Sequence, residues 1–159
     1  MDVIILAVGK IKERYLREGI KEYEKRLKPY CNLRMIEVSE EKEPGGNSLA
    51  ERGRVLEREG ERILAKMPQS GYKIALCIEG ERLSSEEMAG KIKELALRGV
   101  SDITFVIGGS LGLSDNVKKS CDMRLSFSDF TLPHQLMRLL LLEQIYRWFK
   151  IIRGEPYHK

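Results

Sequence analysis

Three segments in the last third of the chain combine residue types that suit ligand binding or proton transfer. The first is the apolar run 103–107, which leads directly into a glycine-rich stretch at 108–114. Glycine lets the main chain approach a ligand closely, and ligands of parallel sheets bind at the carboxyl ends of strands. The stretch lacks the Lys-Ser/Thr of a phosphate loop and does not match G-x-G-x-x-G. A plain strand-to-helix turn is the alternative interpretation.

The second segment, 125–134, joins an expected strand to an expected helix through alternating polar and apolar residues. Such a loop offers main-chain donors and acceptors beside apolar side chains, a combination that suits a purine ring. The alternative is an ordinary connector capped by Thr131 or Asp129. His134, which follows Pro133 at the expected helix start, is better explained as a cap or packing residue than as a catalyst.

The third segment is the chain end, where Tyr157, His158 and Lys159 follow Pro156. An imidazole such as that of His158 can accept a proton near neutral pH. Lys159 and its carboxylate suit a contact with phosphate or with a partner subunit. The alternative is a solvated, frayed end, which is what most chain termini are.

The elements that must position these segments alternate between short apolar runs and longer amphipathic stretches. We predict strands over 3–8, 33–38, 73–78, 103–107 and 123–127, and helices over 12–28, 48–66, 84–98, 115–120 and 133–152. Ser48 with Glu51, and Ser84 with Glu87, have the spacing of capping boxes. Strands that alternate with helices predict an α/β fold with a mainly parallel sheet, and no linker or repeat divides the chain.

The last expected helix is apolar on almost every side. Its apolar residues include Leu136, Leu139, Leu140, Leu142, Ile145 and Phe149. A helix of this kind is buried on more than one side. In a chain of 159 residues, this pattern predicts a subunit interface and therefore a dimer.

Composition and charge limit the classes of protein that this chain can belong to, but they do not identify a binding partner. The formal net charge is +4, which permits an anionic partner but does not require one. Basic residues at 10–21 are interleaved with Tyr15 and Tyr23, so RNA contact is one interpretation, but interspersed glutamates favour a solvated helix face. The three cysteines match neither a disulfide framework nor a zinc site and fit a reducing compartment. No signal peptide or membrane span is expected, so we predict a soluble, cytoplasmic protein.

Taken in order, these motifs resemble the RlmH family of SPOUT-class methyltransferases. The resemblance covers essentially the whole chain and is densest in the last third. The segments that carry it read VIILAVGK at 3–10, FVIGGSLG at 105–112, TLPH at 131–134, EQIYR at 143–147 and PYHK at 156–159. Each motif is weak alone, but their order in a chain of this length is specific.

The resemblance implies methylation of N3 of a pseudouridine in 23S ribosomal RNA, with S-adenosylmethionine as methyl donor. It implies one domain over 1–159 with a SPOUT-type, mainly parallel sheet flanked by helices. A C-terminal trefoil knot would hold the cofactor within about 103–159. It also implies a homodimer with sites at the subunit interface, a substrate within the assembled 70S ribosome, and neither a metal nor a membrane.

The residues that the resemblance assigns fall into two groups. Cofactor contacts carry over to Leu76, Gly108, Phe127, Ser128, Asp129, Phe130, Thr131 and Leu132. The stretch 127–130 varies in the family, so main-chain contacts are expected there. The resemblance assigns substrate binding and catalysis to Tyr157, His158 and Lys159, with Arg147 and Arg153 as further candidates. Our hypothesis is that His158 accepts the N3 proton while Tyr157 and Arg147 orient the base.

Two rival functions share the same features. One is a non-catalytic ribosome-binding or assembly factor that uses the same basic surface. The other is a SPOUT methyltransferase that acts on tRNA. The identity of the proton acceptor stays open, as does the choice between a tail that acts within its own subunit and one that reaches across the dimer. We favour a tail that closes the site of the other subunit, because a chain end beyond an interface helix can reach across.

Overall fold

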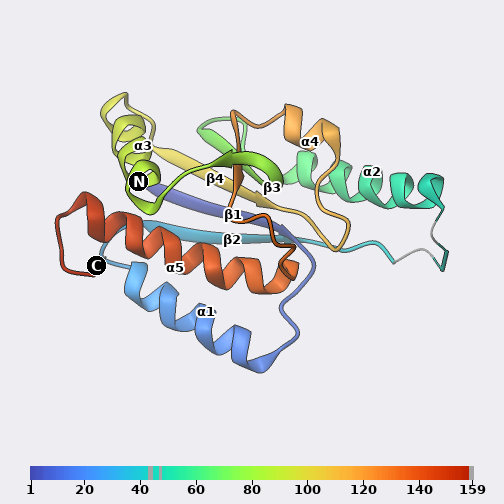
Figure 1. Ribbon diagram of the computed structural model, residues 1–159, viewed down its shortest axis with the longest axis horizontal. Coiled ribbons are helices and arrows are strands. Elements are labelled where there is room, and N and C mark those ends of the chain that lie inside the picture. The colour runs from blue at the N-terminus through green and yellow to red at the C-terminus, as the bar shows by residue number, and fades with distance from the viewer. Residues whose placement is uncertain (43–44, 47, 158–159) are drawn as a thin grey trace.

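A five-stranded parallel sheet lies between two layers of helices in the computed structural model, which describes residues 1–42, 45–46 and 48–157 (Figure 1). The strands are β1 (Asp2–Val8), β2 (Asn32–Val38), β3 (Tyr72–Arg82), β4 (Asp102–Ile107) and β5 (Met123–Ser126). The helices are α1 (Arg14–Leu27), α2 (Leu49–Lys66), α3 (Ser85–Leu97), α4 (Asp115–Lys119) and α5 (His134–Ile152). The predicted α/β class and the order of its elements are confirmed.

The sheet has the order β2-β1-β4-β3-β5, so β1 and β4 lie well inside it. Each pairing between neighbouring strands of the described residues is parallel. Val3 to Val8 are all buried, as expected for a parallel strand covered on both faces. This arrangement explains why β1 and β4 read as continuous apolar runs in the sequence.

Each face of the sheet has its own apolar core. One core joins α1, α3 and α5 to one side of the sheet and includes Ile5, Phe105 and Trp148. The other joins α2 and α4 to the opposite side and includes Leu6 and Val106. Since neighbouring residues of a strand point to opposite faces, β1 contributes alternately to the two cores.

Local signals set several of the element boundaries. Ser84 accepts a hydrogen bond from the Glu87 N–H while the Glu87 carboxylate accepts one from the Ser84 N–H, so the predicted capping box is confirmed. At the start of α2, Ser48 accepts from the Glu51 N–H. Pro133, expected inside the last helix, instead precedes its first residue and provides no side-chain cap.

The third strand is longer than predicted and irregular. Its pairing with β5 runs from Ile74 to Leu76, stops, and resumes at Glu81. A Cβ built on Gly80 would lie 2.5 Å from the carbonyl carbon of Leu125, so only glycine lets the strand return so close to β5. The residues between the two paired stretches therefore arch away from the sheet.

Part of the apolar surface of α5 is buried within its own subunit. Leu142, Ile145 and Phe149 pack into the core shared with α1 and α3, whereas Leu136, Leu139 and Leu140 are only partly buried. Leu139, although only partly buried, packs against the same core beside Gly19 of α1, so contact within the subunit accounts for four of the six residues that predicted a subunit interface. Among the helices of the described residues, none is both long and apolar enough to cross a membrane.

Candidate cofactor cavity and chain end

A cavity of about 270 Å³ lies at the carboxyl ends of β3, β4 and β5. Three separate stretches of chain surround it: the arch after Leu76, the glycine-rich turn after β4, and the loop between β5 and α5. Ligands of open parallel sheets bind at this edge, because loops there leave a hollow that the strands keep rigid. The cavity is the strongest candidate for a ligand site in the described part of the chain.

The glycine-rich stretch is both a tight turn and a cavity wall, so the two interpretations drawn from the sequence are compatible. The Gly112 N–H donates to the Gly109 carbonyl at 3.0 Å, and Gly112 has a φ of +84°. A Cβ built on Gly108 would overlap the Gly112 carbonyl oxygen. Main-chain atoms alone therefore face the cavity at Gly108 and Gly109.

The loop between β5 and α5 is held by its own serines. The Ser126 hydroxyl donates to the Ser128 carbonyl at 3.1 Å, and the Phe130 N–H donates to the Ser128 hydroxyl at 2.9 Å. Neither predicted cap, Thr131 or Asp129, is a side-chain cap of α5. These bonds shape the loop locally and place apolar side chains at the cavity mouth, where Phe130 is 81% exposed.

Seven of the eight predicted cofactor residues line this one cavity: Leu76, Gly108, Phe127, Ser128, Phe130, Thr131 and Leu132. The eighth, Asp129, is not part of the lining. Its carboxylate pairs with Arg82, and both side chains are largely exposed. The structure thus brings together residues that lie up to 56 positions apart, from Leu76 to Leu132.

A fully buried arginine, Arg138, lies next to the residues that line the cavity. Arg138 of α5 donates to the carbonyl oxygens of Val8 and Gly9, at 2.8 and 2.5 Å, and to the Glu37 carboxylate at 2.6 Å. Burial lowers the pKa of Arg138, and the hydrogen bond that Arg138 donates to Glu37 opposes that shift. His134 and Met137, just before Arg138, line the cavity, so this anchor fixes the first turn of α5 against it.

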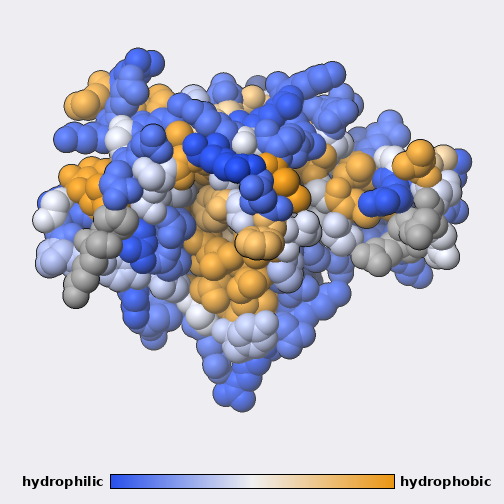
Figure 2. Space-filling view, in the orientation of Figure 1, coloured by the Kyte–Doolittle hydropathy of each residue, from blue (hydrophilic) through white to orange (hydrophobic). Residues whose placement is uncertain are grey.

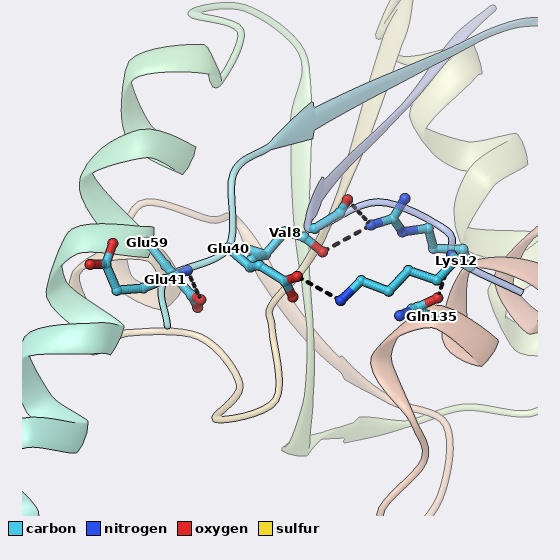
Figure 3. A network of polar contacts seen from close by, with 8 residues as sticks. Val8, Lys12, Glu40, Glu41, Glu59 and Gln135 are labelled. Atoms are coloured by element: carbon cyan, nitrogen blue, oxygen red, sulfur yellow. Dashed lines mark hydrogen bonds and ion pairs between the residues drawn. The ribbon is translucent and has the colours of Figure 1, made fainter. Parts of the chain in front are cut away.

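A polar network continues from this anchor along the ends of β1 and β2 (Figure 3). The Lys12 ammonium donates to Glu40 at 3.0 Å, and the Lys12 N–H donates to the Gln135 side chain at 2.9 Å. The pKa of Glu40 is lowered, chiefly by the hydrogen bond from Lys12. The segment after β1 is therefore tied to both β2 and α5.

A buried carboxylate lies behind the glycine-rich turn. Glu59 of α2 is 4% exposed, and its Oε1 accepts a hydrogen bond from the Glu41 N–H at 3.0 Å (Figure 3). A Cβ built on Gly109 would lie 2.9 Å from Glu59 Oε2, which explains the second glycine of the turn. Burial raises the pKa of Glu59.

The chain end docks on α5 of the same subunit. The Tyr157 hydroxyl donates to Glu143 Oε1 at 3.1 Å, and the ring lies 4.8 Å from the Arg147 guanidinium carbon. Arg147 donates to the same carboxylate oxygen at 2.7 Å. Glu143 thus holds together two of the three described residues to which a role at the substrate was assigned.

The remaining predicted substrate residues have other positions. Arg153 donates to the Pro29 carbonyl at 2.8 Å and lies 4.3 Å above the Tyr30 ring, away from the residues that line the cavity. His158 and Lys159 lie outside the described residues. Tyr157, Arg147 and Arg153 do not line the cofactor cavity.

Sequence reasoning missed several residues of the site. The arch 77–79 and His134 line the cavity, while Glu143 organises the chain end. Gly80 lies beyond the expected strand 73–78 but inside the observed β3, and a glycine inside a strand often marks a bulge, so the arch had no signal within the predicted strand. Glu143 lies four residues before Arg147, and that helical spacing is the signal for their ion pair.

Comparisons with known proteins agree on one family. A family model described as a predicted SPOUT methyltransferase matches residues 1–158. The "Ribosomal RNA large subunit methyltransferase H" of Carboxydothermus hydrogenoformans is 61% identical over all of both chains. The protein of the same name from Clostridioides difficile is 54% identical over all of both chains.

Solved structures share the fold at low sequence identity. A probable methylase family protein from Haemophilus influenzae aligns with a TM-score of 0.54 at 13% identity, covering 99% of this chain and 70% of that one. A probable methyltransferase from Bordetella pertussis aligns with a TM-score of 0.53 at 11% identity, covering 94% and 95%. At such identities the likeness concerns the fold alone.

Proposed function

This chain belongs to the SPOUT methyltransferase family, and we propose that it methylates N3 of a pseudouridine in 23S ribosomal RNA. The observation that carries the proposal is the cavity in which seven residues expected to bind the cofactor come together. Relatives that are 54–61% identical over their full length are named for methylation of large-subunit ribosomal RNA, and they support the choice of substrate.

The residues around the cavity fit S-adenosylmethionine. Its volume of about 270 Å³ and its apolar walls, such as Leu76, Phe127 and Leu132, suit the faces of an adenine ring. The bare main chain at Gly108 and Gly109 suits close contact with polar edges of a ligand. When bound, the cofactor supplies a methyl group activated by a positively charged sulfur.

The reaction breaks the bond between sulfur and the methyl carbon, forms a bond between that carbon and N3, and releases the N3 proton. A neutral imide nitrogen is a weak nucleophile, so the chain must take up this proton and hold the base in line. We assign the proton to His158 and orientation of the base to Tyr157 and Arg147. Lys159 and Arg153 are assigned to phosphate contacts.

A homodimer is part of the proposal. An apolar area lies over α5 in the view of Figure 2, on the side of the helix that neither α1 nor α3 covers. Leu136 and Leu140 are only partly buried and belong to neither apolar core. Contiguous apolar surface of this kind favours a subunit contact. The docking of Tyr157 on its own α5 supports a tail that acts within its own subunit.

The knotted region at 103–159 is also proposed within the single domain 1–159. After β4 the chain runs through α4 on one face of the sheet, pairs as β5 with β3 at the sheet edge, and continues as α5 on the opposite face. A segment that changes faces of the sheet while it pairs with β3 at the edge supports a threaded chain end.

The deciding experiment maps methylation of ribosomal RNA by mass spectrometry in a strain that lacks the gene and in the same strain carrying it. We expect one pseudouridine to lose its N3 methyl group in the deletion strain, in the cytoplasmic ribosomes. Purified protein with S-adenosylmethionine should restore the methyl group on 70S ribosomes and not on free 23S RNA. Unchanged ribosomal RNA together with a lost tRNA methyl group would contradict the proposal.

Calorimetry of the purified protein with S-adenosylmethionine separates an enzyme from a non-catalytic assembly factor. Micromolar binding is the expected result, and the absence of binding would favour the assembly factor.

A further inference from the structure

A second cavity, of about 380 Å³, lies between α3 and α5. It shares a wall with the cofactor cavity, formed by 125–127 and Leu132. On its other side it is lined by Glu143, the residue that holds Arg147 and Tyr157. This cavity therefore lies between the proposed methyl donor and the residues assigned to the substrate.

The polar groups in this cavity are held in a defined arrangement. The Ser85 hydroxyl donates to Gln144 Oε1 at 2.8 Å, and Gln144 Nε2 donates to Glu143 Oε2 at 2.6 Å. An ionised carboxylate can only accept, so Glu143 orients the Gln144 amide with its nitrogen toward the carboxylate. One N–H of Gln144 Nε2 and one lone pair of Gln144 Oε1 remain for a ligand. The contact with Glu143 fixes which side of the amide is the donor and which is the acceptor.

The N1–H and the C2 carbonyl of a pseudouridine base match this arrangement of donor and acceptor. The C2 carbonyl oxygen can accept from the remaining Gln144 N–H, while the N1–H can donate to Gln144 Oε1, which leaves N3 free to receive the methyl group. In uridine and cytidine N1 is bonded to the sugar, so neither base offers this donor. A site that hydrogen-bonds N1–H in this way disfavours both, because its polar groups would lose their partners.

Apolar side chains supply the rest of the lining. Phe127, Met88 and Trp148 lie around the cavity, and Trp148 is 2% exposed. Trp148 Nε1 has no hydrogen-bond partner among the described residues. A carbonyl oxygen at this wall would give that donor a partner, which a purely apolar occupant would not do.

We propose that the cavity between α3 and α5 receives the target pseudouridine base, with Gln144 reading its N1–H and C2 carbonyl and Glu143 positioning Gln144, Arg147 and Tyr157. The inference rests on the proposed function, because it names the site at which the substrate of that reaction binds. It adds a specificity residue, Gln144, and a positioning residue, Glu143, to those assigned above.

The first test uses Trp148, the single tryptophan of the chain, as a reporter. In the full-length protein saturated with S-adenosylhomocysteine, the one indole N–H signal in a ¹H–¹⁵N spectrum is followed while pseudouridine 5′-monophosphate is added. We expect the signal to shift with pseudouridine monophosphate and to shift much less with cytidine monophosphate. A signal that moves equally with both, moves only with protein concentration, or stays still would overturn the inference.

The second test compares Gln144→Leu with Gln69→Leu, the same change at an exposed position. Gln144→Leu should bind S-adenosylmethionine as the parent does and lower kcat/KM for ribosomes by roughly ten- to a hundredfold, the cost of leaving buried hydrogen-bonding groups unpaired. The nucleotide-induced shift of Trp148 should be lost in parallel. Gln69→Leu should change neither quantity.

The two proposals fail in different ways. If the parent protein methylates no ribosomal RNA, the proposed function is wrong. If the parent methylates ribosomal RNA while Gln144→Leu retains its full kcat/KM, the function stands and the base site is wrong.

Discussion

The fully buried guanidinium of Arg138 in α5 donates a hydrogen bond of 2.8 Å to the carbonyl oxygen of Val8, at the end of β1. This contact joins α5 to β1, in which Val3 to Val8 are all buried. The rigidity of the cavity therefore depends on a residue that does not line it.

Replacing Arg138 by Met should lower the free energy of unfolding by about 3–5 kcal/mol, because the main-chain oxygens of Val8 and Gly9 would lose their buried partner. Urea unfolding measures this quantity. Arg34→Met, at an exposed ion pair with Asp2 of 3.8 Å, should cost about 1 kcal/mol or less. If both variants lose the same free energy of unfolding, the buried contact of Arg138 contributes no more to stability than the exposed ion pair of Arg34.

A methyl group at Gly108 should disrupt the turn that forms one wall of the cavity. Because the new Cβ overlaps the Gly112 carbonyl oxygen, Gly108→Ala should destabilise the protein by about 1–3 kcal/mol and weaken S-adenosylmethionine binding in calorimetry. Gly90→Ala, on α3 with no atom within 4 Å of the new Cβ, should instead add about 0.5–1 kcal/mol of stability. Normal cofactor binding by Gly108→Ala would argue against the assigned wall.

Burial of Glu59 predicts a specific pH dependence of stability. Since its pKa is raised in the folded state, the folded protein binds this proton more tightly than the unfolded chain does. Glu59 therefore stabilises the folded protein fully at a pH below its ordinary pKa of 4.5. This stabilisation is lost as the pH rises through the higher pKa of the folded state. The neighbouring charges are Arg62, which lowers this pKa, and Glu40 and Glu41, which raise it.

Glu59→Gln removes that titration. Relative to the parent, the variant should therefore gain free energy of unfolding between pH 4 and pH 8, as measured by urea unfolding across that range. The matched control is Glu57→Gln, at an exposed position on the same helix, which should show no such trend. A constant difference for Glu59→Gln would contradict the buried carboxyl described here.

Glu143 should control the ionisation of Tyr157. Burial, Tyr23 and the Glu143 carboxylate together raise the pKa of Tyr157 to about 12. Glu143→Gln removes the negative charge and should lower this pKa, measured by NMR titration of ¹³C-labelled tyrosine with Tyr157→Phe for assignment. Glu18→Gln, which breaks an exposed ion pair with Arg14, should leave it unchanged. An unaltered Tyr157 titration in Glu143→Gln would mean that the contact is not formed in solution.

The partly buried leucines of α5 should decide the oligomeric state. Leu136→Glu places a charge at a partly buried leucine of α5 that belongs to neither apolar core, and it should convert a dimer to a monomer in sedimentation experiments. Leu97→Glu introduces the same charge at a leucine that is 80% exposed on α3 and should leave the dimer intact. A parent protein that sediments as a monomer would refute the dimer.

Much of the architecture was predictable because its determinants are local. The apolar run of β1, the helical spacing of α1 and the capping box at Ser84 each depend on residues within a few positions of one another. Such signals identify elements and bring their ends close to the right residue. They also indicated a ligand at the glycine-rich stretch, because 108–112 follows directly on a buried strand.

The convergence of distant segments was decided by the tertiary structure. Leu76 and Leu132 reach one cavity because β3 lies between β4 and β5, an order that periodicity along the chain does not encode. The arch after Leu76 exists because β3 resumes its pairing with β5 only at Glu81. Arg138 became a buried anchor because α5 crosses the ends of β1 and β2, where unpaired carbonyl oxygens need donors.

The chain end shows the same division. Its residue types alone marked Tyr157 and His158 as candidates for chemistry. The docking of Tyr157 on Glu143, beside a second cavity, depends on contacts between helix and tail that only the folded chain creates. Residue types and their spacing therefore determined which segments are candidates for binding or chemistry, and the packing of the sheet and helices determined which of them meet.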